Sequence, residues 1–95
     1  MIKVKISFLS LLADIVNEEE LILSIKGDST VKDILNILSR EYGTKFKETI
    51  FTSSDILSNY ILLGLNGRDI RSLDNLNTLL HNGDEISFLP AIAGG

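Results

Sequence analysis

The spacing of apolar residues changes along this 95-residue chain, and the order of these changes is what most limits the fold. Apolar and polar residues alternate over residues 2–8 and again over 21–25, which is typical of half-buried β-strands. Over residues 30–43 the apolar positions recur every three or four residues, which predicts a helix with one apolar face. Strand-like segments return at residues 60–65 and 85–89. This order predicts an α+β fold in which one main helix packs across one face of a mixed sheet.

Turn and cap residues separate these segments. Thr30 is the predicted N-cap of the helix, and Asp33 stands three residues later in the position that completes a capping box. Asn66-Gly67 is the favoured two-residue hairpin turn, so residues 68–70 are expected to return as a short strand. The first and last strands are expected to lie side by side in the middle of the sheet. Residues 45–51 are expected to extend the helical region.

The composition excludes several classes of protein. A net charge of −4 argues against nucleic-acid binding, and no apolar run approaches the roughly 20 residues that cross a bilayer. Cysteine is absent, and His81 has no companion for a metal site. No secretory signal, phosphate-binding glycine loop or acid–base pair of carboxylates is recognisable. We therefore expect a cytoplasmic protein without catalysis of its own, with no bound metal or cofactor, and with no nucleic-acid or membrane partner.

The end of the chain carries the clearest chemical signal, because it is Gly94-Gly95. Pro90 cannot donate a backbone hydrogen bond and is expected to end the last strand. Residues 90–95 are then expected to form a flexible tail on a single domain of residues 1–95. Such a tail reaches roughly 20 Å at about 3.3 Å per residue, far enough to enter another protein's active site. The other interpretation is an ordinary frayed terminus.

The order of elements, residues 82–90 and the final Gly94-Gly95 together resemble the ubiquitin-like β-grasp sulfur carriers. The chain is most similar to the MoaD type, the small subunit of molybdopterin synthase. Residues 1–4, 29–31 and 65–67 also match that pattern. The last five residues are similar to the thiamine-pathway carriers as well, but the long segment 44–59 favours the MoaD type.

The resemblance implies a sequence of chemical steps. A partner adenylating enzyme would use ATP to join the Gly95 carboxylate to AMP, and a sulfur donor would displace AMP to leave a thiocarboxylate. The large subunit of molybdopterin synthase would then use this sulfur in molybdenum cofactor biosynthesis. The tail residues that would enter the partner's active site are Pro90, Ala91, Ile92, Ala93 and Gly94.

Relatives with the same fold and tail serve other functions. Some are protein modifiers that are joined through the last glycine to lysines of target proteins, and others carry sulfur for tRNA thiolation. A binding module with an inert tail is a third interpretation. The sequence leaves these alternatives open.

Strand alternation also predicts a partner-binding face. In the third long strand Ile61, Leu63 and Leu65 are expected to face the helix, so that Leu62 faces away. In the last strand Ile86 and Phe88 are expected to point inward and Leu89 outward. Leu62, Leu89 and Ile92 would then form an exposed apolar patch beside the tail. The alternative is that residues 44–59 cover this side, or that single exposed leucines carry no meaning.

Two acidic residues complete the predicted partner-binding set. Asp84 and Glu85 are expected to pair with partner arginines near the tail. An equally weighted interpretation makes them part of a solvated turn, with Gly83 at positive φ.

Overall fold

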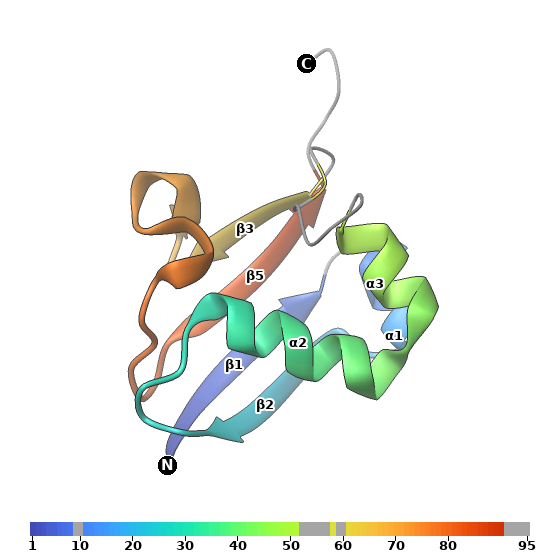
Figure 1. Cartoon of the computed structure of the whole chain (residues 1–95). Coiled ribbons are helices and arrows are strands. Elements are labelled where there is room, and N and C mark those ends of the chain that lie inside the picture. Colours follow the sequence, from blue (N-terminus) through green and yellow to red (C-terminus); the bar gives the residue numbers. More distant parts are fainter. Residues whose placement is uncertain (9–10, 52–57, 59–60, 91–95) are drawn as a thin grey trace.

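The computed structural model describes residues 1–8, 11–51, 58 and 61–90 (Figure 1). The elements in chain order are β1 (Ile2–Phe8), α1 (Leu11–Val16), β2 (Glu20–Ile25), α2 (Val31–Tyr42), α3 (Thr44–Ile50), β3 (Ile61–Leu65), β4 (Arg68–Asp69) and β5 (Glu85–Pro90), with short 3-10 turns at Ile70–Ser72 and Asn75–Asn77 between β4 and β5. None of the helices in the described ranges is long and apolar enough to cross a membrane.

The described strands form one sheet in the order β2-β1-β5-β3-β4. β1 and β5 run parallel in its middle, and the other neighbouring strands pair antiparallel. The helix α2 crosses one face of this mixed sheet (Figure 1). The predicted architecture and the central position of the first and last strands are therefore confirmed.

The core lies between the sheet and α2. Five inward residues of β1 and β5 are at most 1% exposed, namely Val4, Ile6, Phe8, Ile86 and Phe88. They meet the apolar stripe of α2, which consists of Val31, Ile34, Leu35 and Leu38, all fully buried. The apolar face of the sheet, where apolar residues alternate, is thus buried by the apolar face of α2, where they recur every three or four residues. For this reason the order of these two patterns along the chain limits the fold.

The region after α2 is a separate helix. Gly43 has a φ of 84°, a conformation that glycine adopts without strain and that stops α2. The chain then forms α3, whose Phe46 and Ile50 reach the core. The expectation of further helix in this region is confirmed, with Gly43 as the break.

Two predicted strand ends were wrong. β4 stops at Asp69, because the Asp69 side chain accepts a hydrogen bond from the Arg71 N–H at 2.9 Å and caps a 3-10 turn that includes Ile70. β5 continues through Pro90, which lies opposite Ile61 in β3. Proline lacks a backbone N–H but keeps its carbonyl as a hydrogen-bond acceptor, so it is tolerated at the end of a strand.

The N-cap of α2 gives a test of how the sequence sets the helix start. Thr30 Oγ1 accepts from Asp33 N at 3.4 Å, and Asp33 Oδ2 accepts from Thr30 N at 2.9 Å. Thr30→Ala is expected to lower the free energy of unfolding by about 1 kcal/mol in urea titrations, because it leaves a helix N–H unpaired. Thr49→Ala in α3 is the matched control, since Thr49 Oγ1 only donates to the exposed Lys45 carbonyl. Equal losses in the two variants would argue against the capping role.

Candidate functional site

The candidate site lies on the face of the sheet away from α2, where β3 and β5 pair. Leu62 of β3 stands directly opposite Leu89 of β5. Leu89 is 37% exposed, whereas its neighbour Phe88 and the β3 residue Leu63 are buried on the helix side. Leu62 is half-buried. The predicted inward and outward residues of both strands are therefore confirmed.

A shallow depression of about 300 Å³ opens between these leucines and the β3–β4 hairpin. The row next to the leucines pairs Gly64 with Ser87, and both residues are small. A Cβ added at Gly64 would meet only the Arg68 carbonyl oxygen, at 3.7 Å, an ordinary contact. The depression exists because this row of the sheet lacks large side chains beside two exposed leucines.

The sequence analysis assigned Gly64 and Ser87 no part in the site. The available signal was their position two residues from Leu62 and Leu89, which puts them on the same face of the sheet. What the sequence did not supply was the register that sets Gly64 against Ser87.

The rim of the depression on β4 is charged. Arg71 Nη2 lies 2.7 Å from Asp69 Oδ2, and Arg71 Nε lies 3.1 Å from the same oxygen. The hydrogen bonds from Arg71 hold the pKa of the Asp69 carboxyl below its usual range, so the pair stays ionised near neutral pH. Arg68, which also lines the depression, has no ion-pair partner in the part of the chain that the structure describes. The rim thus offers a cation to an acidic group on a partner.

The tail begins where this depression ends. Pro90 is the last described residue, and its Cα lies opposite that of Ile61. The predicted tail residues Ala91, Ile92, Ala93, Gly94 and Gly95 lie outside the described residues. The place of Ile92 in the apolar patch and the role of Gly95 therefore stay predictions.

Asp84 and Glu85 lie at the other end of β5. Asp84 accepts hydrogen bonds from Asn66 Nδ2 at 2.9 Å and from the His81 N–H at 2.8 Å, and so ties two turns together. Glu85 Oε2 accepts from Ser7 Oγ at 3.0 Å. The prediction that these carboxylates lie near the tail is wrong, because the tail leaves from the end of β5 and they stand at its start.

Residues 6–95 match the ThiS family. The chain belongs to this family. A putative sulfur carrier protein from Archaeoglobus fulgidus is 38% identical to it over 66 residues, which cover 70% of this chain and 74% of that protein.

Two small archaeal modifier proteins are also similar to this ThiS-family chain. Small archaeal modifier protein 3 from Haloferax volcanii is 27% identical over 93 residues, 98% of this chain and 99% of that protein. The solution structure of small archaeal modifier protein 1 from Methanosarcina acetivorans superposes with a TM-score of 0.85 and 36% identity, covering 100% of this chain and 98% of that one. The predicted β-grasp fold and the resemblance to ubiquitin-like sulfur carriers are confirmed.

Proposed function

We propose that this ThiS-family protein carries sulfur as a thiocarboxylate on Gly95. The observation that carries the proposal is the family match, which extends through residue 95 and so includes the final diglycine. A carboxylate is a poor acyl donor and needs activation before sulfur can attack it. No cysteine is present in the chain to form a thioester of its own, so both activation and sulfur are assigned to partners.

The proposed chemistry has two balanced steps. In the active site of an adenylating partner, a carboxylate oxygen of Gly95 attacks the α-phosphorus of ATP, and pyrophosphate leaves. A hydrosulfide sulfur then attacks the acyl carbon, AMP leaves with the bonding electrons, and the S–H proton is lost to solvent. The product is a thiocarboxylate at Gly95. Because ATP is consumed by the partner, this chain needs no bound cofactor. The proposed location is the cytoplasm.

The depression beside Leu62 and Leu89 is the proposed docking site for the adenylating partner. Leu89 directly precedes Pro90, so a partner that contacts this face also receives the tail. Because Pro90 belongs to β5, the tail is the five residues 91–95, which would span roughly 17 Å when extended, at about 3.3 Å per residue. Gly94 and Gly95 lack side chains and would allow the backbone to pass through a narrow channel.

Docking on this face predicts a defined loss of activity. Leu89→Asp is expected to lower kcat/KM for adenylation about tenfold or more, because a buried leucine at an interface contributes about 1.5–3 kcal/mol. Pyrophosphate release measures the rate. Ile22→Asp is the matched control, since Ile22 is 65% exposed on the same face but lies on β2. Equal losses in both variants would contradict docking of the adenylating partner at the depression.

The specific role that we propose is that of the small subunit of molybdopterin synthase, supported by the MoaD-type ending of the chain. In this role the large subunit of the synthase binds the thiocarboxylated tail and transfers its sulfur into the dithiolene of molybdopterin. The test combines thiocarboxylated protein, a synthase large subunit and its precursor substrate, and follows dithiolene formation. Thiocarboxylate that survives this mixture would point instead to thiamine synthesis or tRNA thiolation.

A second candidate function is that of a protein modifier, favoured by the 36% identity to a small archaeal modifier protein over the whole chain. In this case a lysine amine of a target attacks the activated Gly95, and AMP leaves. No lysine or arginine follows Arg71, so trypsin would leave residues 72–95 on a modified lysine. A protease that cleaves after glutamate would leave residues 86–95, a shorter remnant to search for by mass spectrometry. Such remnants on target lysines would favour the modifier.

A further inference from the structure

The edge of the sheet at β2 is unpaired in the part of the chain that the structure describes. β2 is the first strand in the sheet order and pairs only with β1. An exposed strand edge presents N–H and C=O groups that can pair with another chain. Proteins commonly protect such edges with charges, prolines or bulges, but after the charged Glu20 at its start β2 contains neither charge nor proline.

The register shows which backbone groups face outward. The Phe8 N–H donates to the Glu19 carbonyl at 2.9 Å. Hydrogen-bonded pairs alternate along an antiparallel ladder, so the odd-numbered residues of β2 bond to β1. The N–H and C=O groups of Glu20, Ile22 and Ser24 therefore point away from the sheet. Together they form a free edge about 13 Å long at about 3.3 Å per residue.

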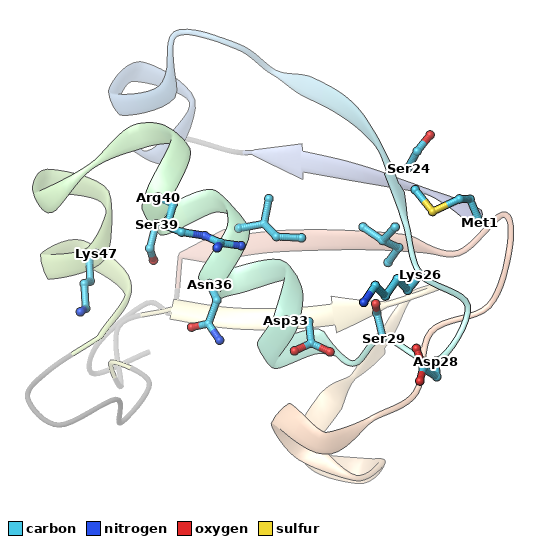
Figure 2. Close-up of a pocket in the computed structure, with 12 residues that line it drawn as sticks. Met1, Ser24, Lys26, Asp28, Ser29, Asp33, Asn36, Ser39, Arg40 and Lys47 are labelled. Carbon is cyan, nitrogen blue, oxygen red and sulfur yellow. The ribbon is translucent and has the colours of Figure 1, made fainter.

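A groove of about 870 Å³ runs beside this edge, between the end of β2 and the helix α2 (Figure 2). Ile25 and Ile37 line it with apolar surface. On the opposite side of the edge, Ile22 is 65% exposed on the face of the sheet away from α2. Because side chains alternate along a strand, an added strand would place one set of its side chains in the groove and the other set beside Ile22.

The groove is richer in cations than the rest of this acidic protein. Lys26, Arg40 and Lys47 line it, and Figure 2 shows them spread along its length. They form no ion pair with any described residue. Two acids also line the groove, Asp28 and Asp33, and the Asp33 carboxylate is occupied by Thr30 in the helix cap. Against a net charge of −4 for the chain, this lining favours a ligand that carries negative charge.

We propose that the β2 edge and this groove bind an extended segment of a partner protein as an added strand. The segment has apolar residues at its centre and acidic residues beside them. Its backbone pairs with Glu20, Ile22 and Ser24, its apolar side chains contact Ile22 and Ile37, and its carboxylates face the groove lysines and arginine. The β2 edge lies two strands away from β5, which carries Leu89 and leads into the tail, so this partner would bind while the tail stays accessible.

The test uses a short synthetic peptide of valine and isoleucine residues flanked by aspartates, titrated into the isotope-labelled full chain up to about 1 mM, the concentration range of weak peptide binding. The amide resonances of Glu20, Ile22 and Ser24 are expected to shift and saturate. The same peptide with alternate backbone amides N-methylated is expected to bind at least about tenfold more weakly, because it loses the strand hydrogen bonds. Equal binding of the two peptides would overturn strand addition.

Charge variants test the groove without disturbing the core. Arg40→Glu and Lys47→Glu are each expected to weaken the acidic peptide about three- to tenfold at low salt, the range expected when an exposed ion pair becomes a repulsion. Lys32→Glu is the matched control, since Lys32 is exposed on α2 but does not line the groove.

A backbone variant tests the strand pairing itself. Ile22→Pro removes an outward N–H and is expected to abolish binding while keeping the pairing with β1.

Two results would contradict the proposal. One is the absence of any saturable shift at the β2 edge over the whole titration. The other is concentration-dependent self-association of the free protein, with shifts at the same amides, which would assign the edge to a second copy of this chain. The activity of the tail is read separately by adenylation, so failure here leaves the proposed sulfur carrier untouched.

Discussion

Removal of Gly95 is expected to abolish thiocarboxylate formation and to leave the stability of the domain unchanged. Deletion shortens the reach of the tail by about 3.3 Å and moves the terminal carboxylate to Gly94. A misplacement of about 1 Å in an active site can lower a rate about 100-fold, so a loss of at least that size is expected. The unfolding midpoint is expected to stay constant, because the buried core described by the structure ends at Phe88.

The measurement is thiocarboxylate yield with the adenylating partner, ATP and sulfide, followed by intact mass. Gly95→Ala is the matched variant, since it keeps the length of the tail but adds a methyl group. It is expected to fall between the wild type and the deletion. Normal thiocarboxylation of the deletion variant would contradict the assignment of Gly95.

Phe88→Ala is expected to have the largest effect on stability, a loss of about 3–5 kcal/mol. Phe88 is fully buried in the central strand β5. Its ring stacks on that of Phe8 with centroids 5.4 Å apart and meets the edge of Phe46 at 6.1 Å. Truncation would remove contacts to the sheet and to α3 at once. A domain with a total stability of about 5–15 kcal/mol would lose a large part of it.

Urea unfolding measures this loss, and the neighbour of Phe88 supplies the control. Leu89→Ala changes the next residue of β5, whose side chain faces the opposite side of the sheet and is 37% exposed. It is expected to cost about 1 kcal/mol, in keeping with its partial burial. Similar losses for the two variants would mean that the core is not centred on the rings of Phe8, Phe46 and Phe88.

Much of the fold followed from local patterns in the sequence. Strand alternation placed Leu63 and Phe88 inside and Leu89 outside, because each strand has one buried face. Thr30 and Asp33 predicted the start of α2, because their side chains satisfy N–H groups that have no partner within the helix. These features depend on residues that are neighbours in the chain, which is why a single sequence reveals them.

The features that the sequence did not reveal depend on pairing between distant strands. The depression requires Gly64 to lie against Ser87, and the free edge requires β2 to stand at the end of the sheet. Register and strand order are set by the packing of the whole sheet. The misplacement of Asp84 has a similar cause: six residues of β5 separate it from the tail, and a strand of that length spans about 20 Å.

The central claim is that Gly95 carries sulfur, and intact mass spectrometry of the protein purified from its own host tests it most directly. The expected species is heavier by the difference between one sulfur and one oxygen atom, and fragmentation is expected to place the change at Gly95. An unmodified chain, even after incubation with ATP, an adenylating partner and sulfide, would contradict the claim.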